Sequence, residues 1–285
     1  MNESEFQALI NLLDDPTPEV YKAVEQKILS YGEEIIPLLE KEWEENIDPI
    51  VQGRIENIIH DVQKNKLAIR FERWCKEESQ DLLKGVYLIA TYQYPDLTFE
   101  KIKEQFEQIY YDCWLATEVN QHPKDQVKAI NHILFNKHHF SPNTRNFHSP
   151  ANSMINAVLE SRKGNPLSLC VIYMLVTQRL GLPVYGVNLP NLFVLIYTES
   201  NSDHEFYINV FNRGLIFSKE DITKYIEQLG IQPKEHYFNP CLNLDIIARM
   251  IRNLLISFEK LGETEKIDEL NQLLNLVLQY ITHPE

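Results

Sequence analysis

The sequence lacks any long apolar run and any secretion signal in its first residues. No stretch approaches the roughly 18 consecutive apolar residues that indicate a membrane-spanning helix. The opening residues, MNESEFQALI, contain no basic segment followed by an apolar one, which is the pattern of a signal peptide. We therefore expect a cytoplasmic protein that does not associate with a membrane.

Cysteine is scarce and its four positions are scattered. Cys75, Cys113, Cys170 and Cys241 form no CxxC pair. A disulfide framework is expected mainly in secreted chains with closely patterned cysteines. We therefore interpret all four as reduced thiols.

Basic residues are also in deficit. The chain has 27 Lys and Arg against 41 Asp and Glu, a formal net charge of −14. Residues 1–64 hold 15 acidic and five basic residues, a net charge of −10. Because binding to phosphate backbones needs a basic surface, nucleic acid is an unexpected partner. The acidic segment is interpreted as a solvated helical surface, and steering of a basic partner is the alternative.

What is present is the composition of a globular protein with strong helical patterns. Apolar residues make up 44% and charged residues 24% of the chain, both ordinary values for a globular domain. Residues 1–64 show apolar stripes at helical spacing, with Pro18 and Pro49 at expected helix starts and Gly32 at an expected stop. We predict four short helices and a first domain at 1–64.

The following segment, residues 65–160, is predicted to be helical up to an irregular loop. Helices are expected over 66–92, 98–116 and 125–135, and a Pro-, Asn- and Ser-rich loop over 138–153. His138, His139 and His148 in this loop could suggest a metal site. However, no thiol or carboxylate stands at ligand spacing beside them, so we expect no metal and no cofactor.

The best-defined pattern lies between residues 161 and 217. Asn165 is a good N-cap and Pro166 a good first helical residue, and Gly181 and Pro183 end a helix over 166–180. Strand-like runs follow at 184–189, 193–198, 205–211 and 215–217. The predicted class is α+β and predominantly helical, with a central helix against a small antiparallel sheet.

The tail, residues 239–285, carries two amphipathic stripes separated by Gly262. We expect these two helices to pair with each other and to cap the core. A groove for a partner is the alternative.

Three motifs of this core resemble the transglutaminase-like superfamily, and more narrowly its Sir-B-type branch. They are GNPLSLCVIYMLVTQRLGLPVYGVNLP, FVLIY and YINVFNRG followed by FSKEDI. The resemblance implies HEAT-like helices at 1–64, a transglutaminase-like (papain-like) core at 65–238, and a tetratricopeptide-like hairpin at 239–285.

The resemblance also implies the position of a Cys-His-Asp site, and this sequence leaves that site degenerate. The three positions fall on Pro166, Leu192 and Asn209. None of these side chains can act as nucleophile, base or charged orienting group. Two other nucleophiles could act instead: Cys170, one helical turn further on, and Ser168, paired with His204.

We therefore predict a pseudoenzyme, a scaffold or binding module for an unidentified protein or peptide. Asn165, Ser168, Asn191 and Asn209 are the candidate residues of its binding cleft. The alternative is a divergent thiol or serine hydrolase or transferase that uses Cys170 or Ser168. A purely structural subunit is the third interpretation.

Overall fold

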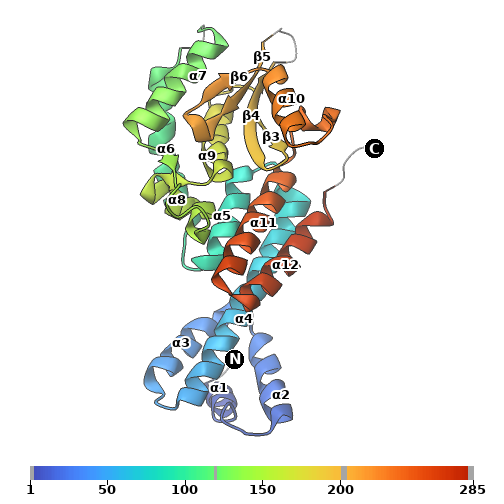
Figure 1. The fold of residues 1–285 in the computed structure, drawn as a ribbon. Coiled ribbons are helices and arrows are strands. Elements are labelled where there is room, and N and C mark those ends of the chain that lie inside the picture. The colour runs from blue at the N-terminus through green and yellow to red at the C-terminus, as the bar shows by residue number, and fades with distance from the viewer. Residues whose placement is uncertain (1–2, 119–120, 200–203, 282–285) are drawn as a thin grey trace. The chain divides into compact units, whose positions relative to one another are not determined.

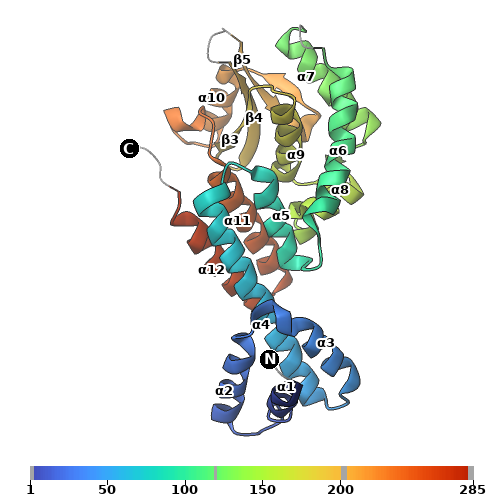
Figure 2. The same ribbon diagram turned by 180° about the vertical axis from the view of Figure 1, so that it is seen from behind.

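The structure is a computed structural model that describes residues 3–118, 121–199 and 204–281. It is α+β and predominantly helical, as predicted (Figure 1, Figure 2). The helices are α1 (Glu3–Ile10), α2 (Pro18–Leu29), α3 (Ile36–Glu45), α4 (Pro49–Arg73), α5 (Leu82–Gln93), α6 (Phe99–Ala116), α7 (Pro123–Asn131), α8 (Ile155–Ser161), α9 (Pro166–Arg179), α10 (Lys219–Gln228), α11 (Asn243–Leu261) and α12 (Thr264–Leu278). The strands are β1 (Ser141–Pro142), β2 (Lys163–Gly164), β3 (Val184–Leu189), β4 (Leu192–Thr198), β5 (Glu205–Asn209) and β6 (Leu215–Phe217).

The chain separates into two compact units, one ending at Arg70 and one beginning at Phe71. In the first unit the apolar stripes of α1 to α4 form one shared core, as their helical spacing indicates. Its buried members are Phe6, Ile10, Leu13, Val24, Ile28, Ile35, Leu39, Val51, Ile55, Ile58 and Val62.

One helix boundary differs from the prediction. A separate helix over 66–92 was expected, but α4 runs without a break from Pro49 to Arg73, and the interruption falls at 79–81. No Pro or Gly stands between Gly53 and Gly85, so no residue of either kind breaks the helix near 64. The predicted boundary at residue 64 therefore lies inside a helix.

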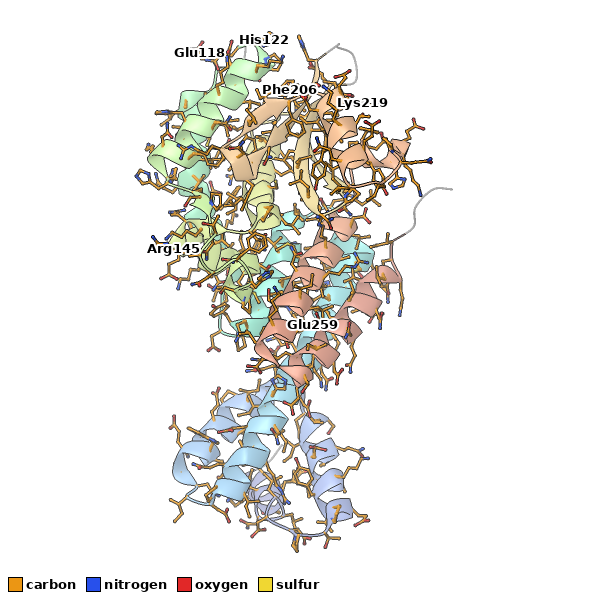
Figure 3. All side chains as sticks on the ribbon, viewed as in Figure 1. Glu118, His122, Arg145, Phe206, Lys219 and Glu259 are labelled. Carbon is orange, nitrogen blue, oxygen red and sulfur yellow. The ribbon has the colours of Figure 1, made fainter. Side chains whose placement is uncertain are left out.

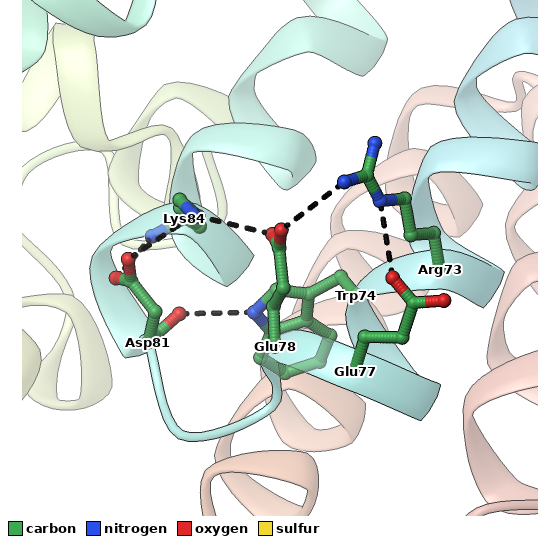
Figure 4. A network of polar contacts seen from close by, with 6 residues as sticks. All are labelled: Arg73, Trp74, Glu77, Glu78, Asp81 and Lys84. Atoms are coloured by element: carbon green, nitrogen blue, oxygen red, sulfur yellow. Dashed lines mark hydrogen bonds and ion pairs between the residues drawn. The ribbon is translucent and has the colours of Figure 1, made fainter.

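Polar contacts fix the turn between α4 and α5 (Figure 4). The Asp81 carboxylate accepts a hydrogen bond from the Lys84 backbone N–H at 3.0 Å and so caps α5. The Trp74 indole N–H donates to the Asp81 carbonyl at 2.9 Å. The Lys84 ammonium lies 3.3 Å from Glu78.

The second unit is built on the four-stranded antiparallel sheet β3-β4-β5-β6. Helix α9 packs against β3 and β4. The other face meets α10, through a cluster that joins Val187, Val194 and Ile196 to Ile222 and Ile226. Figure 1 and Figure 2 show α9 and α10 on opposite sides of the sheet. Alternate residues of β4 therefore face different helices.

The C-terminal helices α11 and α12 pack against each other, with Gly262 at a positive φ of 76° between them. Helix α11 also contacts α5, α9 and β3, so this hairpin belongs to the second unit. Within the described ranges, no helix combines the length and the apolar character needed to cross a bilayer.

Gly214 contacts α7 just before β6, and a substitution there tests the packing of α7 against the sheet. Its φ is 75°, its carbonyl accepts from the Asn131 side chain at 3.0 Å, and an added Cβ would overlap that side chain. Gly181 has a similar φ of 77° but open space around it. We expect Gly181→Ala to lower the free energy of unfolding by about 1–2 kcal/mol, from the left-handed backbone alone.

We expect Gly214→Ala to cost about 1–3 kcal/mol more than Gly181→Ala, because of the overlap with Asn131. Urea unfolding of both variants measures the difference. Equal losses would contradict the packing described.

Candidate functional site

A pocket of about 460 Å³ lies at the N-terminal end of α9. Its walls come from the loop before α8, the start of α9, the β3–β4 hairpin and one face of α11. The lining residues are Phe147, His148, Asn165, Pro166, Leu167, Asn188, Leu189, Asn191, Phe193, Arg249, Arg252, Asn253, Ile256 and Ser257.

Asn165 fixes the start of α9 at this pocket. Its side-chain oxygen accepts from the Ser168 backbone N–H at 2.8 Å, which confirms it as the N-cap. Its amide nitrogen donates to the Ser153 hydroxyl at 2.9 Å. Gly164 allows the close approach, because a Cβ there would overlap the Ser168 hydroxyl. Pro166, without an N–H, follows as the first helical residue.

A buried asparagine holds the loop that brings Phe147 and His148 to the pocket. The Asn152 amide donates to the carbonyls of Asn146 at 2.7 Å and Phe147 at 3.0 Å. Its oxygen accepts from the Asn143 amide at 2.8 Å. Three hydrogen bonds of one buried side-chain amide thus fix this loop.

The β3–β4 hairpin sets the direction of the Leu192 side chain. Leu189 pairs with Leu192, so Pro190 and Asn191 form a two-residue turn, in which Asn191 has a φ of 57°. Leu192 packs with the cluster on the α10 face of the sheet, whereas Phe193 lines the pocket. The side chain that faces α9 is therefore that of Phe193, and Leu192 points away from the helix.

Asn209 caps a turn outside the pocket. It is the last residue of β5, and its side-chain oxygen accepts from the Asn212 backbone N–H at 3.1 Å. It caps the short 3-10 turn after the strand and is absent from the pocket lining described above. The pocket lining described above therefore does not include this candidate cleft residue.

Cys170 is fully buried one helical turn after Pro166. Its thiol donates weakly to the Phe193 carbonyl at 3.6 Å. Burial raises the pKa of the Cys170 thiol far above its ordinary value. The thiolate, which is the nucleophilic form, is therefore strongly disfavoured.

The second rescue candidate, Ser168 with His204, is not assembled. Ser168 is 2% exposed, and its hydroxyl donates to the Asn165 carbonyl at 3.2 Å. It is therefore a core residue and not a cleft residue. His204 packs its ring on that of His122, with centroids 5.0 Å apart.

The sheet register separates His204 from the pocket. Residue 204 precedes Glu205, which pairs with Thr198 at the far end of β4 from Phe193. Five residue steps along a strand span about 17 Å. Figure 3 labels His122 at the end of the sheet opposite α11.

The histidines of the 138–153 loop do not gather around one point. The His138 ring bonds to the Asp112 carboxylate at 2.8 Å, and His148 lines the pocket. In the described part of the chain, no three His, Cys, Asp or Glu side chains stand close enough together to hold a metal ion.

Two arginines on α11 are the site residues that sequence reasoning missed. The Arg249 guanidinium donates to the Leu189 carbonyl at 2.9 Å and to the Asn188 side chain, and lies 5.6 Å from the centre of the Phe193 ring. Burial lowers the pKa of Arg249 from its usual value. Arginine nevertheless keeps its charge in proteins.

A sequence signal for this face did exist. Lining residues of α11 recur at helical spacing, at positions 249, 252, 253, 256 and 257. This is a second stripe beside the apolar one, and it mixes charge, amide and hydroxyl groups. The stripe can be recognised as part of a pocket only when α11 is seen packed against the β3–β4 hairpin.

Comparison with known proteins matches residues 100–252 to the family model of the transglutaminase-like superfamily. A UPF0162 protein of Xylella fastidiosa is 32% identical over 186 residues, which cover 62% of this chain and 65% of that protein. F-box only protein 21 of Mus musculus is 26% identical over 250 residues, 77% of this chain and 39% of that protein.

A UPF0162 protein of Vibrio cholerae is 24% identical over 154 residues, which cover 53% of this chain and 56% of that protein. The chain thus spans less than two thirds of the length of these relatives. No solved structure matches the chain.

A thiol introduced at the pocket wall tests this geometry. In Pro166→Cys, the N-terminus of α9 and the nearby arginines should stabilise the thiolate, so we expect a thiol pKa below its usual value of about 8.5. At neutral pH, iodoacetamide should alkylate this thiol at least about 100-fold faster than Cys170, since each pKa unit changes the thiolate fraction tenfold.

Mass spectrometry of the native protein over a pH series measures both rates in one sample. A thiol at position 166 that reacts no faster than Cys170 would show that the start of α9 does not face an accessible pocket.

Proposed function

Because the chain belongs to the transglutaminase-like superfamily, we propose that it is a non-catalytic member that binds a segment of protein or peptide at the start of α9. One observation carries this proposal. The resemblance of the core motifs implies a nucleophile at the start of α9, but the pocket wall there is Pro166 and the thiol one turn away is buried.

The chemistry of the lining supports binding rather than turnover. Covalent catalysis needs a nucleophile within hydrogen-bond reach of a base. His148 could serve as a base, but no cysteine stands among the described lining residues. The hydroxyl there, that of Ser257, is buried and donates to the Asn253 carbonyl at 2.9 Å.

The size and the mixture of groups suit a peptide ligand. A volume of about 460 Å³ lies within the usual range for ligand pockets, roughly 300–1,000 Å³. Amide side chains at Asn188, Asn191 and Asn253 can bond a peptide backbone, while Phe147 and Ile256 offer apolar surface.

We also infer that the chain belongs to one branch of the superfamily. The motifs of the core support the Sir-B-type branch, with HEAT-like helices at 1–64 and a tetratricopeptide-like hairpin at 239–285. Such helical repeats serve as binding scaffolds. The position of α11 in the pocket wall gives the C-terminal hairpin a direct part in the proposed binding.

The alternative, a divergent hydrolase or transferase, finds less support. Its two nucleophiles, Cys170 and Ser168, are both buried. Either would require the start of α9 to open before reacting. The Ser168 hydroxyl and the Asn165 cap would both lose hydrogen bonds in that opening.

A turnover assay separates these two functions. We expect no amine–glutamine transfer, peptide hydrolysis or ester hydrolysis by the native chain above the rate in buffer, because no activated nucleophile faces the pocket. Activity that disappears in Cys170→Ala or Ser168→Ala would contradict the non-catalytic assignment. Cys113→Ala, another buried thiol in the same unit, is the matched control for any loss through unfolding.

A further inference from the structure

The pocket carries positive charge within an acidic protein. The whole chain has a net charge of −14, but Arg249 and Arg252 line the pocket, and no Asp or Glu occurs among its described lining residues. A concave site lined by one sign of charge concentrates ligands of the opposite sign. The ligand that suits this wall is an anion.

Arg249 is held in one orientation by its neighbours. One of its terminal nitrogens donates to the Leu189 carbonyl and to the Asn188 side chain, and its plane lies near the Phe193 ring. A guanidinium fixed at one edge keeps its other donors in a set direction. Planar, two-pronged donation of this kind matches an oxyanion.

Among the residues that the structure describes, neither pocket arginine has a carboxylate counter-ion. In the described part of the chain, no carboxylate forms an ion pair with Arg249 or Arg252, whereas Arg179 of α9 pairs with Glu107. Arg252 is exposed, but Arg249 is half-buried, and a half-buried cation without a counter-ion costs free energy, because it loses water and gains no opposite charge. A bound anion would remove that cost.

The remaining lining distinguishes a peptide from a free inorganic anion. Phe147 and Ile256, both exposed, provide apolar walls beside the arginines. A small hydrated ion would leave these walls uncovered. An apolar side chain next to a carboxylate would cover them and reach both arginines.

We propose that this pocket recognises a carboxylate flanked by apolar residues in a peptide, held by Arg249 and Arg252. This inference rests on the proposed binding function and names its ligand class. The carboxylate can be the chain terminus of the peptide or an acidic side chain, since both present the same planar group.

The test uses the full chain and fluorescence polarisation with four fluorescein-labelled hexapeptide pools that share mixed apolar residues. The first pool ends in a free carboxylate. The other three are amidated and carry glutamate, glutamine or phosphoserine before the last residue. We expect the first or the second pool to bind at least about tenfold more tightly than the glutamine pool. Which of the two binds identifies the source of the carboxylate.

Charge variants locate the binding. Arg252→Gln changes an exposed residue, so it should leave the fold intact and weaken binding of the preferred pool by about tenfold or more. Arg249→Gln should do the same. Lys260→Gln removes an equal charge from an exposed position at the end of the same helix, outside the pocket, and should leave binding unchanged.

The possible outcomes are distinct. Equal binding of all four pools, or full binding by Arg252→Gln, overturns the carboxylate assignment and leaves the binding function standing. A preference for the phosphoserine pool alone also overturns it, in favour of a phosphate ligand. Failure of every pool to bind contradicts the proposed binding function itself.

Discussion

The hydrogen bond from Arg249 to the Leu189 carbonyl joins the C-terminal helix pair to the β3–β4 hairpin, and the pocket depends on it. The same guanidinium bonds to Asn188 and lies near the Phe193 ring. It therefore orients three of the groups that form the pocket wall. Because the guanidinium is charged and half-buried, the contact also leaves positive charge in a place that water reaches poorly.

The start of α9 forms another part of the pocket wall. Asn165 caps the helix and bonds to Ser153, and Gly164 lets the chain pass close to Ser168. In a thiol enzyme such a helix terminus would lower the pKa of a cysteine. Here Pro166 stands at the first position, and Cys170 faces the core, where burial raises its pKa. In the proposed binding, the electrostatic field of this helix terminus acts on a bound ligand without any nucleophile.

Local patterns in the sequence predicted the elements that build the site, and long-range contacts decided what the site contains. The Asn165 cap, the Gly181 stop and the strands near 184 and 193 depend on neighbouring residues, so they could be predicted. Which residues of β4 face α9 could not be predicted in this way. A shift of one residue along the strand exchanges Leu192 for Phe193 on the face toward α9. Arg249 meets Leu189 across 60 residues of sequence, and no local pattern indicates that contact. For α4 the local sequence was informative but was misread. No Pro or Gly lies near residue 64, and the helix continues through the boundary that was predicted there.

Hydrogen exchange of the full chain, measured by mass spectrometry with and without whichever carboxylate pool binds more tightly, tests the central claim most directly. The account predicts slower exchange in residues 165–169, 188–193 and 249–257 when the pool is present, and recovery of the peptides at their original mass. Protection confined to other segments, or peptides recovered as hydrolysed or amine-linked products, would contradict it.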